Sequence, residues 1–123
     1  MTLASSSTHL TAANVCDNNI INQDVAVTPS TSLLTFPTAA SIISSCLTQT
    51  GDYRTVLFKN TSNETDEFVT LTANTGDDFS YASTSATAAD TTANLHAEGS
   101  ALVRFTNLNE ASVSVDIIQF QEH

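Results

Sequence analysis

The chain contains 123 residues, with three Lys or Arg against thirteen Asp or Glu, and its formal net charge is −10. This length fits one domain with one core. Three isolated cations cannot neutralise many phosphates, so the composition excludes nucleic acid as an expected partner. It equally disfavours adhesion to an anionic membrane face, and no apolar run is long enough to span a bilayer. The expected partners are therefore proteins, glycans or solvent.

Residues 1–10 are polar and rich in Ser and Thr. They predict a flexible or partner-docked N-terminal arm ahead of a single domain over residues 11–123. The arm has neither the basic stretch nor the apolar stretch of a secretory signal. Cys16 and Cys46 are the only cysteines, and they could form one bridge, but sequence does not set their separation in space. Because no export signal is visible, two buried thiols are the favoured state.

The first part of the domain contains the one expected helix. Residues 11–15 fit a first turn or a short strand, and residues 24–28 fit a strand that ends before Pro29. The helix is expected within residues 33–47, because Pro37 suits a first helical turn and apolar residues follow at helical spacing. Those apolar residues are Ala39, Ile42, Ile43 and Cys46.

From residue 53 the apolar pattern changes to period two, which predicts strands. Both faces of residues 53–60 carry apolar groups, so this strand is expected to be partly buried on both sides. Gly76 is expected to supply a positive φ in a turn, and the change of apolar parity near Ile117 predicts a bulge. Further strands are expected at 68–72, from 79, at an edge within 82–94, at 101–106 and at 113–117, with turns at 74–78 and 107–110.

Six to eight short strands at a spacing of roughly 8–12 residues, with one short helix, predict a mainly β protein. We expect an antiparallel β-sandwich. A single jelly roll is the favoured topology, and an immunoglobulin-like Greek key is the alternative.

Residues for catalysis are sparse. The chain has no G-x-S-x-G motif, and its three glycines are too far apart to form a phosphate-binding loop. His96 is the one histidine away from the ends, and a histidine in a polar strand is more often a surface residue than a general base. A small hydrolase would need His96 beside a serine and a carboxylate. We expect no enzyme, no catalytic residue and no cofactor-binding residue.

Two acidic stretches supply oxygen ligands of the kind that Ca²⁺ prefers, namely Asp77-Asp78 and the group Glu64, Asp66 and Glu67. Neither stretch has the ligand spacing of an EF-hand, and acidic loops are normal in an acidic protein. Two cysteines and His96 are too scattered for zinc. We therefore expect no metal site and no cofactor.

A succession of short motifs resembles a family of small virion-associated domains of tailed phages and large DNA viruses, mostly of aquatic origin. The resemblance covers roughly residues 11–120, and the chain departs from the family pattern after Gly76. The motifs are T-A-A-N-V at 11–15, L-T-F-P-T-A-A at 34–40, F-K-N-T at 58–61, V-T-L-T-A-N-T-G at 69–76 and L-V-R-F-T-N-L at 102–108.

The resemblance implies a β-sandwich virion structural protein without catalytic residues. We expect a small capsid component, vertex (penton-like) or minor, that assembles with copies of itself as a pentamer or trimer and contacts other virion proteins. The expected localisation is the virion, without membrane insertion. The alternative is a receptor- or glycan-binding module of a spike, tail or fibre. That module would expose Phe79 or Tyr81, with Ca²⁺ held by Asp77 and Asp78.

Overall fold

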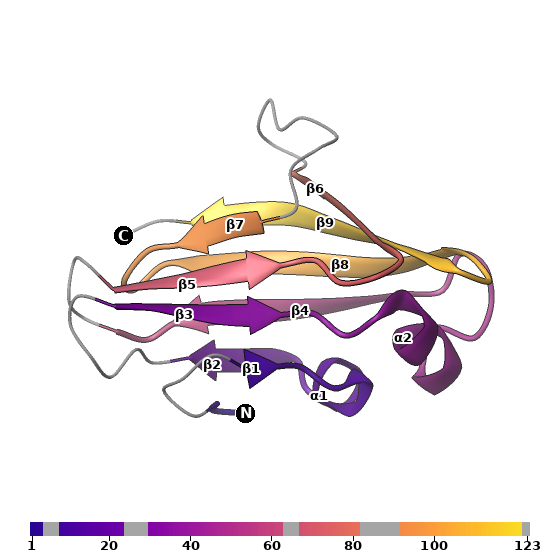
Figure 1. Cartoon of the computed structure of the whole chain (residues 1–123), viewed down its shortest axis with the longest axis horizontal. Helices are drawn as coiled ribbons and strands as arrows, with labels where there is room; N and C mark the ends of the chain where they lie inside the picture. The colour runs from indigo at the N-terminus through magenta and orange to yellow at the C-terminus, as the bar shows by residue number, and fades with distance from the viewer. Residues whose placement is uncertain (4–7, 24–29, 63–66, 82–91, 122–123) are drawn as a thin grey trace.

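Two mixed β-sheets and two short helices make up the described part of the computed structural model (Figure 1). The structure describes residues 1–3, 8–23, 30–62, 67–81 and 92–121. The protein is mainly β, as the sequence predicts. The elements are β1 Thr8–His9, α1 Ala12–Asp17, β2 Ile20–Gln23, β3 Ser30–Thr35, α2 Ala39–Ser45, β4 Tyr53–Asn60, β5 Glu67–Thr72, β6 Asp77–Tyr81, β7 Thr92–Leu95, β8 Ser100–Asn109 and β9 Ser112–Gln121.

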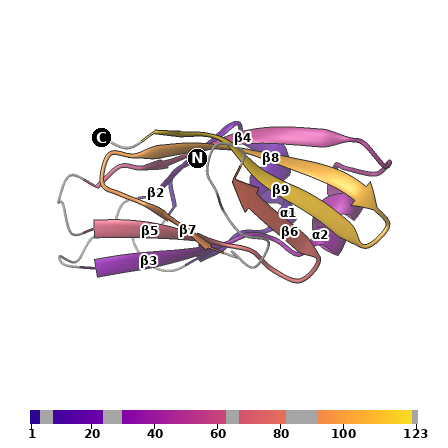
Figure 2. The same ribbon diagram turned by 90° about the horizontal axis from the view of Figure 1, so that it is seen from above.

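The strand order is β1-β3-β5-β7 in one sheet and β2-β4-β8-β9-β6 in the other. Figure 2 shows the two sheets as separate layers, one over the other. From β1 to β6 the chain alternates between the sheets, so β1, β3 and β5 run in the same direction and pair in parallel. The antiparallel pair of β8 and β9 lies between β4 and β6 in the five-stranded sheet.

The predicted antiparallel pairing holds for only part of the described ladders. β4–β8, β5–β7 and β8–β9 are antiparallel, whereas β1–β3, β2–β4, β3–β5 and β6–β9 are parallel. Neither a single jelly roll nor an immunoglobulin-like Greek key is confirmed, because both are built from antiparallel ladders. A period-two pattern marks a strand in either direction, so the relative direction depends on which strands become neighbours.

α1 and α2 begin with the same pattern, a Thr followed by two alanines. Thr11 Oγ1 accepts a hydrogen bond from the Asn14 amide (3.2 Å), and Thr38 Oγ1 accepts one from the Ser41 amide (3.4 Å). Each Thr therefore caps a helix whose first amides have no intrahelical partner. Each helix connects a strand of the four-stranded sheet to a strand of the five-stranded sheet.

The prediction of a helix within residues 33–47 is confirmed by α2, but the prediction that it is the one helix is wrong. Residues 33–35 belong to β3, and the helix covers only Ala39–Ser45. Leu34 is buried beside Leu71 in the ladder to β5, and Pro37 and the N-cap Thr38 separate this strand from the helix. α1 is a second helix, in the segment for which a turn or a short strand was expected.

The predicted strand over residues 53–60 is confirmed as β4, and the prediction for 68–72 is confirmed within β5. The strand over 113–117 is confirmed within β9. The strand predicted at 24–28 lies outside the described residues. Of the predicted stretch 82–94 the structure describes only the end, which belongs to β7.

Two local predictions are confirmed and one is wrong. Gly76 has a φ of +82°, and the ladder register shifts where Ile118 is the extra residue of β9, next to Ile117. The prediction of a turn at 107–110 is wrong at its start, because β8 continues to Asn109 and the turn follows it.

The core contains three phenylalanines in mutual contact. The ring centroid of Phe36 lies 5.5 Å from that of Phe58 and 5.3 Å from that of Phe105. Phe58 and Phe105 belong to the five-stranded sheet, whereas Phe36 follows the end of β3. All three rings are at most 1% exposed, so they join the two layers through burial and edge-on packing.

The described residues of the predicted arm lie against the domain. The Leu3 amide donates to Asn22 O and the Asn22 amide donates to Met1 O, both at 2.9 Å. β1 pairs with β3, and Leu10 is 4% exposed. Residues 1–3 and 8–10 therefore extend the two sheets instead of projecting from them.

A buried amide connects the two layers at the other end of the strands. Asn60 Nδ2 donates to the carbonyl oxygens of Glu67 (3.1 Å) and Leu95 (2.9 Å), and Asn60 Oδ1 accepts from the Ser62 amide (3.0 Å). Because Asn60 is 1% exposed, these bonds are shielded from water and substituting Asn60 would leave buried partners unsatisfied.

Candidate interaction surface

The outward face of the five-stranded sheet carries a row of apolar side chains. Ile20, Leu57 and Leu102 are register partners across β2, β4 and β8. Their chain neighbours Ile21 and Val56 point into the core, so the three side chains point outward. Ile20 is 45% exposed, and the other two are half-buried. Cross-strand partners lie about 5 Å apart, so the row forms a continuous apolar strip.

Two further exposed side chains extend this face. Tyr53 at the start of β4 is 66% exposed, and Leu108 near the end of β8 is 44% exposed. The guanidinium carbon of Arg104 lies 5.3 Å from the Tyr53 ring centroid, which is a cation–π contact. This contact places a positive charge beside the apolar strip.

All three Lys and Arg residues of the chain belong to this sheet: Arg54 and Lys59 to β4, and Arg104 to β8. Lys59 and Arg104 are exposed on the outward face. Arg54 instead turns toward α1, where its Nε donates to Val15 O and its Nη2 donates to Asn19 Oδ1 (3.2 Å). The rest of the surface has no Lys or Arg, and the N-terminal ammonium of Met1 donates to Ile20 O (2.8 Å).

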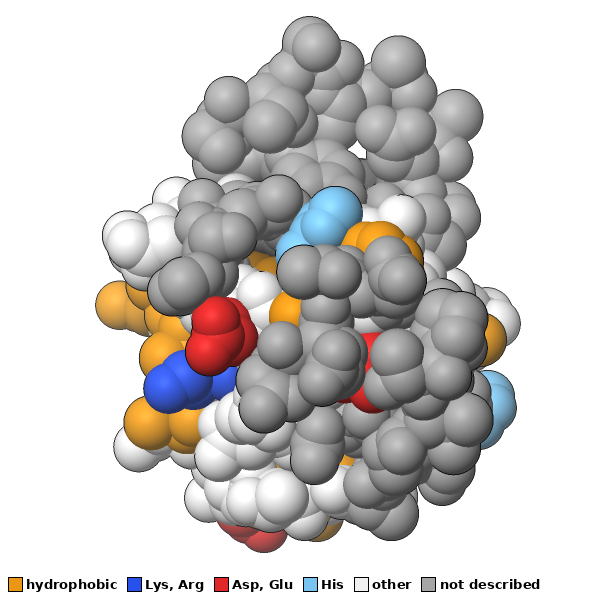
Figure 3. Space-filling model, turned by 90° about the vertical axis from the view of Figure 1, so that its left-hand side faces the viewer, with side chains coloured by type: hydrophobic (Ala, Val, Ile, Leu, Met, Phe, Trp, Pro, Cys, Tyr) orange, Lys and Arg blue, Asp and Glu red, His pale blue; other side chains and the backbone are white. Residues whose placement is uncertain are grey.

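Acidic residues follow on the neighbouring strands of the same face. Arg104 is the register partner of Asp116 on β9, and Ser114 is the partner of Asp78 on β6. Asp78 is exposed. The face therefore changes from apolar and basic over β2, β4 and β8 to acidic and hydroxyl-bearing over β9 and β6. Figure 3 shows hydrophobic side chains along the left margin, with a basic and an acidic side chain next to each other among them.

The outward face of the four-stranded sheet has a different chemistry. Leu33 is 42% exposed, and the rings of Phe68 and His96 meet edge to face with centroids 4.8 Å apart. Thr70 Oγ1 donates to Asn94 Oδ1 at 2.8 Å. Among the described side chains on this face there is no Asp, Glu, Lys or Arg, so it offers apolar, aromatic, hydroxyl and amide groups.

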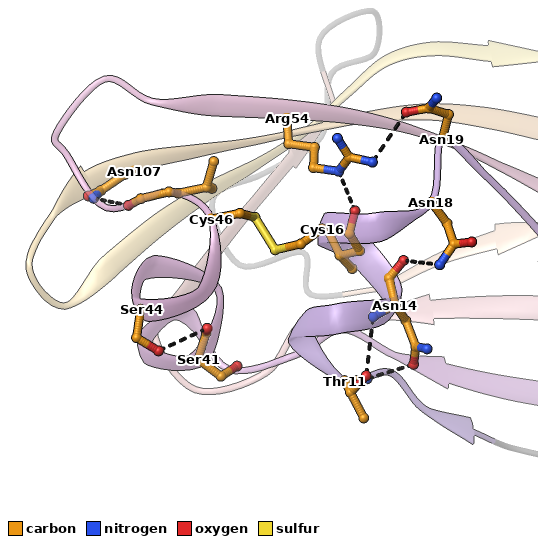
Figure 4. The surroundings of a disulfide bond; sticks show 12 residues. Thr11, Asn14, Cys16, Asn18, Asn19, Ser41, Ser44, Cys46, Arg54 and Asn107 are labelled. Atoms are coloured by element: carbon orange, nitrogen blue, oxygen red, sulfur yellow. Dashed lines mark hydrogen bonds between the residues drawn. A yellow bond between two sulfur atoms is a disulfide. The ribbon is translucent and has the colours of Figure 1, made fainter.

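A disulfide joins the two helices (Figure 4). Cys16 at the end of α1 and Cys46 at the C-cap of α2 have an S–S distance of 2.05 Å and Cα atoms 5.9 Å apart. The prediction of two thiols was wrong. Both helices lie at the same end of the sheets, an arrangement that a separation of 30 residues in sequence does not reveal.

Of the acidic residues considered as possible Ca²⁺ ligands, Asp77 and Glu67 lie apart in the structure. Asp77 Oδ2 accepts from the Asn74 amide (3.0 Å), and burial raises the pKa of Asp77 from 3.8 to about 7. Glu67 is 3% exposed at the start of β5, at the opposite end of that strand from the turn to Asp77. Glu64 and Asp66 lie outside the described residues. Within the described ranges, no group of three or more His, Cys, Asp and Glu could hold a metal ion.

The remaining predicted site residues are separate from these. His96 is exposed and its ring packs against Phe68. The side chains of Phe79 and Tyr81 lie outside the described part. The apolar row of Ile20, Leu57 and Leu102 was not predicted as a site. Its one sequence signal was the apolar content on both faces of residues 53–60.

No helix in the described part of the chain is long and apolar enough to cross a membrane. Comparisons with protein-family models, with curated proteins and with solved structures found no match to this chain.

Proposed function

We propose that the chain is a structural component of a virus particle that acts by packing against copies of itself and other particle proteins. The observation that carries this proposal is the apolar row on the outward face of the five-stranded sheet. Three in-register apolar side chains form a strip of the kind that protein partners cover, and Tyr53 is exposed farther along β4. The resemblance of residues 11–120 to virion-associated domains supplies the viral context.

The disulfide supports the same proposal. Disulfides persist in oxidising surroundings, and virion surfaces are among them. The Cys16–Cys46 bridge closes a loop that contains α1, β2, β3 and α2, so it stabilises the end of the molecule where the helices lie. A particle component that remains outside the cell benefits from such a cross-link.

The arrangement of the two sheets supports a β-sandwich. The three core phenylalanines come from both layers, and alternate residues of each strand point toward this shared core. Within the particle we propose a vertex or minor capsid position, with the chain assembled as a cyclic pentamer or trimer. Protein partners suit a chain with so few cations, and binding to nucleic acid or insertion in a membrane does not.

The test is the mass of the purified chain in solution, measured by light scattering at low and at high salt. A discrete trimer or pentamer of the 13.0 kDa chain supports the proposal. A monomer in both conditions contradicts self-assembly and moves the search to ligands.

A receptor- or glycan-binding module is the second candidate, and the four-stranded sheet favours it. Phe68 and His96 present ring edges, and Thr70 and Asn94 present a hydroxyl and an amide on the same face. Aromatic, amide and hydroxyl groups are common in small-ligand sites. Binding on a glycan array that is lost in Asn94→Leu would favour this module over the capsid component.

A further inference from the structure

We propose that a second copy of this chain docks on the outward face of the five-stranded sheet. The inference rests on the proposed function, because it names the partner and the surface through which self-assembly occurs. The surface is defined by Ile20, Leu57 and Leu102, with Lys59 and Arg104 beside them; we call it the β4–β8 face.

The apolar part of the β4–β8 face supplies the driving force for docking. Ile20, Leu57 and Leu102 are aligned across three neighbouring strands, and each keeps part of its side chain in water. Covering these side chains removes contiguous apolar area from water, which favours association. Aromatic and Arg side chains are enriched in the centres of interfaces, and Tyr53 with Arg104 adds such a pair.

Charge identifies the occupant. Lys59 and Arg104 are exposed on the β4–β8 face, where Lys59 lies opposite Ser100 and Arg104 lies opposite Asp116 of the same chain. Arg54 is engaged with α1, and the rest of the surface has no Lys or Arg. The complementary partner therefore presents carboxylates beside apolar or hydroxyl groups. A second copy of this chain, with its net charge of −10, has that character.

The edge strand β6 offers a suitable carboxylate. Asp78 on β6 is exposed, whereas Asp116 on β9 is already the register partner of Arg104 and accepts from Ser114 Oγ (2.7 Å). In a heterologous contact, as a closed trimer or pentamer requires, a second copy can place its edge strand β6 with Asp78 beside Lys59. The outward face of the four-stranded sheet has an exposed leucine but no described charge, so it lacks this complementarity.

The first experiment compares two substitutions at equally exposed aliphatic positions. Ile20→Asp introduces a carboxylate on the β4–β8 face, and Leu33→Asp introduces one on the opposite face, where Leu33 is 42% exposed against 45% for Ile20. Light scattering across a dilution series gives the midpoint of dissociation, and circular dichroism checks that both variants are folded. We expect Ile20→Asp to raise the midpoint concentration at least about tenfold and Leu33→Asp to leave it unchanged.

The second experiment keeps the change in net charge equal. Lys59→Gln removes a cation from the β4–β8 face, and Asn94→Asp adds a carboxylate to the other sheet, so each lowers the net charge by one. We expect only Lys59→Gln to weaken assembly, with the larger effect at low salt, because salt screens exposed charges. Equal effects of the two variants would mean that only the net charge matters.

The outcomes separate this inference from the proposed function. An oligomeric parent chain that dissociates in Ile20→Asp and not in Leu33→Asp supports docking on the β4–β8 face. An oligomeric parent chain that responds to neither, or only to Leu33→Asp, overturns the inference and leaves self-assembly intact. A parent chain that is monomeric at every concentration overturns both.

Discussion

Reducing the Cys16–Cys46 disulfide is expected to destabilise the protein substantially. The bridge closes a loop with a sequence separation of 30 residues. In the chain-entropy account, a cross-link of this span lowers the entropy of the unfolded chain and stabilises the fold by about 3.6 kcal/mol. With an unfolding entropy near 2.1 cal/mol/K for each of 123 residues, this corresponds to a melting temperature lower by roughly 14 °C.

Few native contacts need to change when the bridge is broken. Cys16 and Cys46 are both half-buried, so two thiols or two alanines remain tolerable in the folded state. The helices keep their Thr caps, and Arg54 still bonds Val15 O. The expected loss therefore comes chiefly from the greater freedom of the unfolded chain.

The assay is urea unfolding with and without dithiothreitol, followed by circular dichroism. The double variant Cys16→Ala/Cys46→Ala is the control, since its transition must not respond to the reductant. We expect the reduced parent chain and the double variant to unfold at similar urea concentrations, both well below the oxidised chain. A loss smaller than about 1 kcal/mol on reduction, or two reactive thiols in the unreduced denatured protein, would refute the reasoning.

Four further substitutions test the core, the cap and the buried polar groups. Burial raises the pKa of Asp77 from 3.8 to about 7, so the folded state favours the protonated carboxyl. The stabilising contribution of this group is complete below pH about 4 and is lost as pH rises through about 7. In urea unfolding measured from pH 4 to pH 8, Asp77→Asn should therefore make the midpoint depend less on pH. Asn60→Ala should cost about 3 kcal/mol in urea unfolding, because three buried backbone groups lose their partner; a cost below about 1 kcal/mol would contradict this account. Phe105→Ala should cost about 3–5 kcal/mol by leaving a cavity beside two other rings, and an unchanged melting temperature would exclude that packing role. Thr11→Ala should cost about 1 kcal/mol through the lost helix cap, and a variant as stable as the parent chain would show that the cap is dispensable.

The site was harder to predict than the strands. An outward leucine such as Leu57 and an inward valine such as Val56 look alike in sequence, because β4 carries apolar groups on both faces. The row with Ile20 and Leu102 depends on register between strands that are distant in the chain. The disulfide depends in the same way on two helices meeting at one end of the sheets.

One helix could have been predicted from a signal in the chain. Thr11 and Thr38 each precede two alanines, a polar residue and an aliphatic residue, and both begin a helix. Comparing the two segments would have indicated α1. Pro37 placed Leu34 ahead of the helix, but the short segment before it has no clear alternation that would have predicted β3.

The sequence by itself determined the mainly β class, most strand positions in the described part, the turn at Gly76 and the bulge near Ile117. These features follow from alternation along one strand and from the conformational freedom of single residues, which are local properties. Only the tertiary structure decided the parallel pairing, the Cys16–Cys46 bridge and the composition of the β4–β8 face. Each of these depends on which distant segments become neighbours. Those neighbours are set when apolar side chains from the whole chain are buried together in one core.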